Sequence, residues 1–295
     1  MAPSSAIYAG VELGGTKCVV LLARGPDEIL ARETLPTTLP DETLGSIEQI
    51  LAAWRSEHGF AALGIASFGP IDLDRASPRY GEITSTPKPG WRGTQVRARL
   101  ERAADVPTAF DTDVNGAALA EMRWGSGQGF DDVAYITVGT GVGVGLIVNG
   151  KPTRGFAHCE LGHIRVARIR DDKFSGSCPF HGDCVEGLAS GPSLKARVGD
   201  HIADPAEDDP VWESISSALA QLCHAIVCAA APLAIAMGGG VIDNRPHLLP
   251  RIEKHLVQSL NGYMELPASP YVRAPLLGPD AGPLGAIALA MTAWR

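Results

Sequence analysis

Apolar residues along the chain follow two alternating patterns. Short continuous apolar runs predict buried strands, at residues 7–11, 18–23, 61–68, 108–110, 133–138, 144–148, 234–237 and 271–274. Longer stretches with apolar residues three and four positions apart predict helices, at residues 43–58, 94–104, 191–200, 211–231, 250–260 and 282–294. Another helix is expected to open after residue 113. Strands that alternate with helices in this way indicate an α/β fold.

Two pairs of these strands are joined by turns rich in glycine and threonine. The residues are Gly14, Gly15, Thr16 and Lys17 in the first turn, and Gly139, Thr140 and Gly141 in the second. Glycine lets backbone N–H groups approach a phosphate, although a plain hairpin turn has the same composition. The first turn is not a P-loop, because a strand follows it. The recurrence of the turn after roughly 125 residues predicts a duplicated fold whose halves hold a polyphosphate from both sides.

Composition narrows the class of protein. With 295 residues, 45% of them hydrophobic, and a mean hydropathy of +0.06, the chain can form one large core or, as we favour, two lobes with a cleft between them. A net charge of −8 and a pI near 5.5 argue against nucleic acid as a main partner. No apolar run reaches the roughly 18 residues of a membrane span, and no leader sequence is visible, so we expect a cytoplasmic protein.

One segment carries residues of the kinds that bind metals. Cys178, His181 and Cys184 have a C-x2-H-x2-C spacing, and His163 lies upstream of them. Two thiolates and two imidazoles form a closed tetrahedral set for Zn²⁺, which leaves no open position for water and therefore predicts a structural zinc. His158 and Cys159 are competing candidates for the fourth ligand, and buried cysteines with ordinary surface histidines are the metal-free alternative.

Three further places suggest a binding site. Asp113 lies at a strand-to-helix junction, where a carboxylate acts either as a helix cap or as a base that takes a proton from a hydroxyl. Thr84 and Thr86 lie in a proline-broken loop, where they bind a ligand or only form a turn. Residues 238–240 are three glycines after a strand, which suit an adenine ring or a tight turn.

Together these residues resemble the ROK family of sugar kinases, and more narrowly its zinc-containing fructokinases. The motifs are GGTK at 14–17, ITSTPKPGW at 83–91, DTDVNGAALAE at 111–121, VGTGVGVG at 138–145, ELGH at 160–163, CPFHGDCVEGLASGP at 178–192 and GGG at 238–240. The resemblance implies an actin/hexokinase-like duplicated fold of two α/β lobes with ribonuclease H-like halves and a central cleft. We place the lobes at residues 1–112, joined by the helix at 282–295, and at residues 113–281 with the zinc loop.

The resemblance also implies a role for each matching residue. Asp113 would be the catalytic base, and Glu160, His163 and Glu186 would bind the sugar. To these we add Thr84 and Thr86, from the loop that carries the motif at 83–91, as candidate contacts of the sugar. Phosphate motifs would be Gly14, Gly15, Thr16 and Lys17 in one half and Thr140 and Gly141 in the other, and the adenosine motif would be Gly238, Gly239 and Gly240. ATP with Mg²⁺ would be the phosphoryl donor, and Zn²⁺ would be held by His163, Cys178, His181 and Cys184.

Two positions depart from the pattern of the family. Thr112 stands where the glucokinases of the family have Asn, which favours fructose over glucose, and Glu12 stands where many members have Asp. We therefore expect an ATP-dependent kinase that converts D-fructose to fructose 6-phosphate and forms a homodimer through the apolar helix at 211–231. The alternatives are another hexose or an amino sugar, or a non-catalytic sugar-binding relative. A repressor of the family needs an N-terminal helix-turn-helix, for which a strand starting by residue 7 leaves no room.

Overall fold

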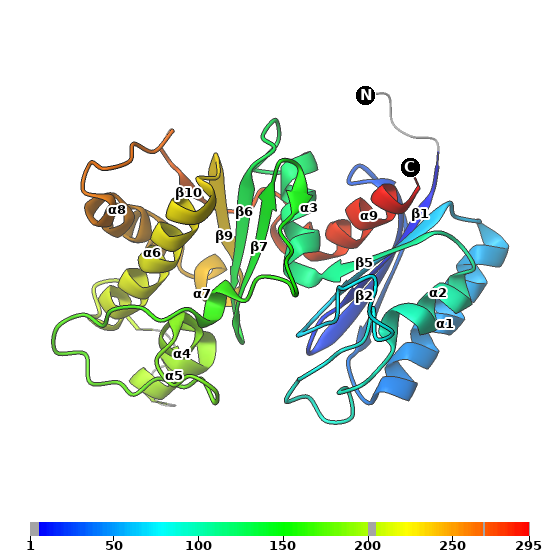
Figure 1. Ribbon diagram of the computed structural model, residues 1–295, viewed down its shortest axis with the longest axis horizontal. Helices are drawn as coiled ribbons and strands as arrows, with labels where there is room; N and C mark the ends of the chain where they lie inside the picture. The colour runs from blue at the N-terminus through cyan, green and yellow to red at the C-terminus, as the bar shows by residue number, and fades with distance from the viewer. Residues whose placement is uncertain (1–5, 200–204, 268, 295) are drawn as a thin grey trace. The chain divides into compact units, whose positions relative to one another are not determined.

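A computed structural model describes residues 6–199, 205–267 and 269–294. The chain divides into two compact units (Figure 1). Unit 1 comprises Met1–Trp124, Pro152–His158 and Pro279–Arg295, and unit 2 comprises Gly125–Lys151 and Cys159–Gly278. Each unit has its own hydrophobic core.

Unit 1 is built on a five-stranded sheet with the order β3-β2-β1-β4-β5. The strands are β1 (Tyr8–Leu13), β2 (Lys17–Gly25), β3 (Glu28–Pro36), β4 (Ala62–Ser67) and β5 (Thr108–Thr112). β2 is antiparallel to both β1 and β3, whereas β1, β4 and β5 are parallel to one another. The carboxyl ends of these three parallel strands therefore meet at one edge of the sheet, where ligands of α/β proteins commonly bind.

Unit 2 repeats this arrangement with the order β10-β9-β6-β7-β8. The strands are β6 (Val133–Val138), β7 (Val142–Val148), β8 (Lys151–Pro152), β9 (Ala234–Gly238) and β10 (Val272–Arg273). β6 and β7 are antiparallel, as β1 and β2 are, and β6, β9 and β10 are parallel, as β1, β4 and β5 are. The shared order confirms the duplicated fold predicted from the two glycine turns.

The helices of unit 1 are α1 (Pro40–Glu57), α2 (Val96–Ala104), α3 (Asp113–Trp124) and α9 (Ala281–Ala293), preceded by the 3₁₀ turn η2 (Gly278–Asp280). α9 packs on α3, β1 and β4. The contact is close because glycines face it: a Cβ at Gly64 would overlap the carbonyl of Ala286, and a Cβ at Gly285 would overlap the backbone of Gly116. α3 groups with unit 1, whereas the sequence predicts that the second lobe starts at residue 113.

Unit 2 contains η1 (Leu161–His163), α4 (Val185–Ala189), α5 (Gly191–Val198), α6 (Val211–Ala230), α7 (Gly240–Asp243) and α8 (Leu248–Leu260). The expected end of α5 at residue 200 lies outside the described residues. α6 is long and apolar enough to cross a membrane by length and composition, but half of its most apolar window is buried in the unit. It packs on α8 and α4, as the core helix of a globular domain does.

Candidate functional site

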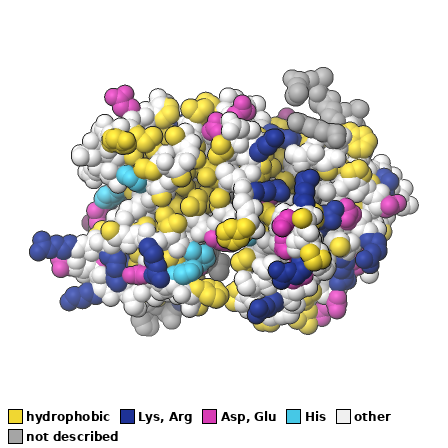
Figure 2. Space-filling model, in the orientation of Figure 1, with side chains coloured by type: hydrophobic (Ala, Val, Ile, Leu, Met, Phe, Trp, Pro, Cys, Tyr) yellow, Lys and Arg dark blue, Asp and Glu magenta, His cyan; other side chains and the backbone are white. Residues whose placement is uncertain are grey.

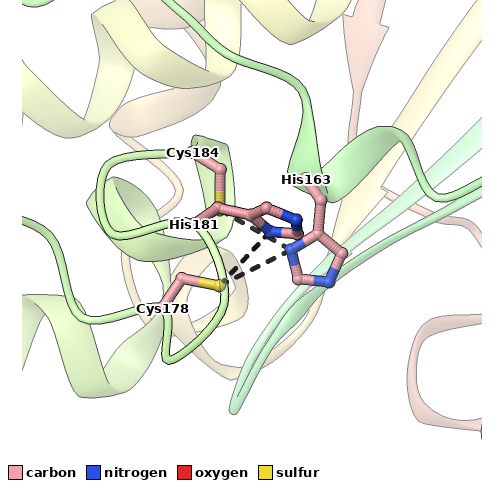
Figure 3. A group of neighbouring side chains, drawn as sticks. All are labelled: His163, Cys178, His181 and Cys184. Carbon is pink, nitrogen blue, oxygen red and sulfur yellow. Dashed lines mark hydrogen bonds between the residues drawn. The ribbon is translucent and has the colours of Figure 1, made fainter. Parts of the chain in front are cut away.

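Four side chains of unit 2 bring their metal-binding atoms together (Figure 3). All four ligand atoms lie within 4.8 Å of one another, and they belong to His163, Cys178, His181 and Cys184. The Nδ1 atom of His163 is 3.8 Å from the sulfur of Cys178 and 3.6 Å from that of Cys184. The Nδ1 atom of His181 is 3.6 Å from the sulfur of Cys178.

These spacings fit a tetrahedral zinc site. Zn–S bonds of about 2.3 Å and Zn–N bonds of about 2.0–2.1 Å at a tetrahedral angle place sulfur and nitrogen about 3.6 Å apart. Two thiols and two imidazoles are also a donor set that zinc prefers. Both imidazoles approach the cluster through Nδ1, so the Nε2 atoms face outward. The competing candidate His158 is used elsewhere, since its Nε2 accepts the backbone N–H of Ile71 in unit 1 at 3.1 Å.

The backbone around the cluster is tightly turned. The N–H of Gly182 donates to the carbonyl of Cys178 at 2.9 Å, and the N–H of Cys178 donates back to Gly182 at 3.2 Å. Gly182 has φ +66°, a conformation that favours glycine. Cys184 caps α4, because its sulfur accepts the N–H of Gly187 at 3.5 Å. Burial raises the pKa of the Cys184 thiol to about 11, a rise that a bound metal ion would oppose.

Glu186, a predicted sugar ligand, reaches the second glycine turn. Its Oε2 atom accepts the N–H of Val142 at 3.1 Å and lies 2.6 Å from the position that a Cβ would take on Gly141. Gly162 of η1 packs against the carbonyl of Val142, so closely that a side chain on this glycine would overlap it. Unit 2 therefore brings the metal cluster, Glu186 and the second turn into one continuous region.

Other predicted residues flank this region. Glu160 is exposed and immediately precedes η1, where its carbonyl accepts the N–H of His163 at 3.0 Å. Thr140 is exposed at the tip of the second turn. The carbonyl of the preceding residue, Gly139, accepts the N–H of Gly191 at 2.8 Å, which connects the turn to the start of α5.

The glycines after β9 have different surroundings. Gly239 has φ +92°, and a Cβ there would lie 2.7 Å from the backbone of Val138, so its position demands glycine for packing alone. A Cβ on Gly238 would lie 2.8 Å from Pro275, whereas Gly240 faces open space. Of the three residues of the predicted adenosine motif, only Gly240 leaves room beside it.

In unit 1, Asp113 begins α3 directly after β5. The structure gives the capping role to its neighbour, since the hydroxyl of Thr112 accepts the N–H of Asn115 at 3.1 Å. Oδ1 of Asp113 accepts the N–H of Val114 at 2.9 Å, and the residue is only partly buried. The alternative that Asp113 serves as the helix cap is therefore not the arrangement observed.

The junction that carries Asp113 is fixed by a buried carboxylate that the sequence analysis did not single out. Asp111 is fully buried, and its Oδ1 accepts the N–H of Thr112 and the side-chain amide of Asn115, both at 2.8 Å. Its Oδ2 forms an ion pair with Arg154, which comes from the segment Pro152–His158. Arg154 lacks any local motif, so its pairing could not be read from sequence.

Glu12 lies at the carboxyl end of β1 and titrates abnormally. Burial, and next the nearby carboxylate of Asp113, raise the pKa of Glu12 to about 7, against the weaker opposing effects of Lys17 and Arg32. Gly282, in the first turn of α9, makes room for this carboxyl group, because a Cβ there would overlap Glu12. Glu12 and Asp113 are therefore two carboxyl groups that interact at the same edge of the sheet.

The two threonines of the proline-broken loop stabilise the loop itself. The hydroxyl of Thr84 donates to the carbonyl of Pro70 at 3.1 Å, and the hydroxyl of Thr86 accepts the N–H of Lys88 at 3.2 Å. Both residues have the turn-forming role that we gave as the alternative to sugar binding. Lys88 itself reaches the first glycine turn, where its ammonium group lies 2.7 Å from the carbonyl of Gly15.

Comparison with known proteins adds to this geometry. Residues 8–293 match the model of the ROK family. The chain is 42% identical to the fructokinase of Zymomonas mobilis subsp. mobilis, with 97% of each chain covered, and 41% identical to the fructokinase of Lactococcus lactis subsp. cremoris, with 92% of each covered.

Two solved structures have the same fold. A ROK hexokinase from Thermus thermophilus matches with a TM-score of 0.80 and 26% identity, over 97% of this chain and 98% of that one. A ROK family glucokinase from Streptomyces griseus, in complex with glucose and AMPPNP, matches with a TM-score of 0.75 and 28% identity, over 97% of this chain and 99% of that one. These matches confirm the actin/hexokinase-like two-lobe fold. The chain belongs to the ROK family.

Proposed function

We propose that this protein is an ATP-dependent fructokinase, which transfers the terminal phosphoryl group of ATP to D-fructose and forms fructose 6-phosphate. The observation that carries this proposal is the identity of 41–42% to two fructokinases over at least 92% of each chain. The glucokinase solved with glucose and AMPPNP supports a hexose and ATP as the two substrates.

Asp113 is the base in the proposed reaction. A phosphoryl transfer needs an attacking hydroxyl held in line with the phosphate, and a carboxylate that accepts the proton as the hydroxyl attacks. Asp113 suits this role because its neighbour Thr112 caps the helix instead, while the network around buried Asp111 holds the backbone of the junction in place. Glu160, His163 and Glu186, with Thr84 and Thr86 as weaker candidates, are the proposed contacts of the sugar.

The phosphates of ATP are assigned to the two glycine turns. Gly14, Gly15, Thr16 and Lys17 form one site and Thr140 with Gly141 the other, and backbone N–H groups in such turns bind anions. Mg²⁺ would accompany the nucleotide and neutralise part of its charge. Of the glycines after β9, Gly240 is the one with space for a ligand, and Gly238 and Gly239 shape the backbone beside it.

The metal cluster is assigned a structural zinc. His163, Cys178, His181 and Cys184 would fill a tetrahedral zinc site, so a bound ion would supply no activated water and would hold the loop that contains Glu160 and His163. His163 belongs to this loop through η1, which packs on β7, so a metal bound to His163 would help to fix the backbone from which the proposed sugar ligands extend.

We further propose that the protein is cytoplasmic, forms a homodimer and does not act on nucleic acid or membranes. Acidic and basic side chains are interspersed on the visible face (Figure 2), and the net charge is −8, which does not suit binding along the phosphate backbone of a nucleic acid. The apolar side of α6 is used largely inside unit 2, so a dimer needs other surfaces. The exposed Val257 of α8 and Tyr263 beyond it are candidates.

A coupled assay of ADP release tests the proposed function. We expect fructose to support turnover more efficiently than glucose, mannose, glucosamine or N-acetylmannosamine, measured as kcat/KM at saturating MgATP. Asp113→Asn should lower kcat at least about 1,000-fold with a change of less than fivefold in the KM for fructose, while Asp27→Asn, the same substitution in an exposed turn, should leave both unchanged. Absence of fructose-dependent ADP release by the wild-type enzyme would refute the proposal.

A further inference from the structure

The first glycine turn directs all four of its carbonyl groups toward protein partners. The carbonyl of Gly14 accepts the hydroxyl of Thr37 at 2.7 Å, and that of Thr16 accepts the N–H of Thr37 at 2.9 Å. The carbonyl of Lys17 accepts the N–H of Gly14 at 3.1 Å. The remaining carbonyl, that of Gly15 at the tip, accepts a hydrogen bond from Lys88 at 2.7 Å.

This pattern determines where the N–H groups of the tip point. In a trans peptide the C=O of one residue and the N–H of the next lie on opposite sides. Since the carbonyl of Gly15 turns toward Lys88, the N–H of Thr16 turns away from it. Within the described part of the chain, no hydrogen bond uses the N–H of Gly15 or of Thr16, and a side chain placed on Gly15 would meet open space. Successive N–H groups of a turn that are not used by the protein are available to bind an anion.

Lys88 is held in place by the loop from which it extends. Its own N–H donates to the hydroxyl of Thr86 at 3.2 Å, and it lies between two prolines. Further along the loop, Trp91 is fully buried, and its indole N–H donates to the carbonyl of Thr38 at 2.8 Å. The loop is thus attached through Thr38 to the residue next to Thr37, which itself hydrogen-bonds to the glycine turn.

The ammonium group of Lys88 also adds charge at the turn. An ammonium group has three donors, and the carbonyl of Gly15 takes one of them. With Lys17, it places two cations beside a backbone site for anions, whereas Glu12 contributes the opposing carboxyl group nearby. The hydrogen bond between Lys88 and Gly15 joins residues 73 positions apart in the sequence. It connects the loop proposed to contact the sugar with the turn proposed to bind the phosphates.

We propose that Lys88 is a positioning residue for nucleotide binding: by holding the carbonyl of Gly15, it keeps the N–H of Thr16 turned outward to bind the phosphates of a nucleoside triphosphate. This proposal rests on the proposed function in assuming that the turn binds the phosphates of ATP. It assigns to the loop at residues 83–91 a role in phosphate binding in addition to its predicted contact with the sugar.

Nucleotide binding without sugar tests the proposal, because no turnover occurs. Titration calorimetry would give the Kd of MgATP and MgADP, and ligand-observed NMR would give the Kd of adenosine. The proteins compared are the wild type, Lys88→Met, Lys88→Arg and the control Lys254→Met, which removes an exposed lysine on α8. The hydrogen bond to the Gly15 carbonyl acts on nucleotide affinity only by keeping the N–H of Thr16 turned outward, so its loss in Lys88→Met should weaken MgATP and MgADP binding by about tenfold, the size expected when one charge-assisted hydrogen bond no longer organises the site. Adenosine binding should change less than twofold, Lys88→Arg should recover most of the lost affinity, and Lys254→Met should match the wild type.

Two results would overturn the proposal. One is affinity for MgATP within twofold of the wild type in a folded Lys88→Met protein, and the other is an equal loss of adenosine affinity, which would indicate general damage to the site. If circular dichroism shows that Lys88→Met does not fold, the affinities for MgATP and adenosine are measured on Lys88→Gln instead. The proposal again requires a loss of MgATP affinity without an equal loss of adenosine affinity. The fructose-dependent turnover of the wild type decides the proposed function separately, since the Lys88 test requires neither sugar nor catalysis.

Discussion

Replacing Glu12 by glutamine should make the protein more stable at alkaline pH and remove part of its pH dependence. Burial and the carboxylate of Asp113 raise the pKa of Glu12 from 4.5 to about 7. Between these two values the folded protein holds a proton that the unfolded chain has released. Stability contributed by this group is therefore fully present below pH 4.5 and is lost as the pH rises through 7.

The size of the effect follows from the two pKa values. At about 1.36 kcal/mol per pH unit, a rise from 4.5 to about 7 corresponds to about 3 kcal/mol lost by pH 8. Glutamine keeps the shape of the protonated carboxyl group but cannot ionise. The difference in free energy of unfolding between Glu12→Gln and the wild type should therefore be near zero at pH 4 and rise to about 3 kcal/mol in favour of the variant at pH 8.

Urea unfolding of the ligand-free protein at pH 4, 5, 6, 7 and 8 measures this difference. Tryptophan fluorescence is a suitable signal, because four of the five tryptophans lie in unit 1, which contains Glu12. Glu33→Gln, a substitution on the exposed strand β3, serves as the control and should show no such trend. A difference between Glu12→Gln and the wild type that stays constant from pH 4 to pH 8 would refute the burial argument.

Three further changes test other parts of the structure. Elemental analysis should find one equivalent of zinc in the wild type and none in Cys184→Ser, and the variant should have a Tm several degrees lower. A chelator should lower the Tm of the wild type but not that of the variant. Arg154→Met should lower the free energy of unfolding in urea by about 1–3 kcal/mol, because it leaves the buried carboxylate of Asp111 without its cation. The double variant Arg154→Met/Asp111→Asn should recover part of that loss. Gly64→Ala should cost about 1–3 kcal/mol, since its Cβ would overlap the carbonyl of Ala286; a neutral effect on Tm would contradict that packing.

The parts of the fold that sequence predicted well are those with a strong local signal. Strands such as β4 and β6 are continuous apolar runs because they are buried on both faces, and the glycine turns between paired strands revealed the duplication. β3 was not predicted. It is an edge strand in which most residues are exposed, so it lacks both an apolar run and strict alternation. α7 was also missed, because one helical turn that begins with glycine has no periodic pattern.

The candidate site also contains residues that a local sequence pattern predicts and residues that it does not. The metal cluster was predictable because three of its ligands lie within seven residues, and the spacing itself limits the geometry. The pairing of Lys88 with Gly15 and that of Arg154 with Asp111 join residues 73 and 43 positions apart. Such contacts depend on tertiary packing rather than on local pattern, so neither residue type nor spacing could identify the partner.

The place of α9 has a consequence for how the protein is made. This helix covers β1 and β4 of unit 1, yet the ribosome synthesises it only after the whole of unit 2. Until α9 has been made, the part of the sheet that packs on it lacks this cover, although α1 and α2 already contact strands of the same sheet, and transiently exposed apolar surface favours aggregation. Unit 1 therefore completes its fold after unit 2, although its synthesis starts first. A variant truncated just before α9 should accumulate as insoluble protein.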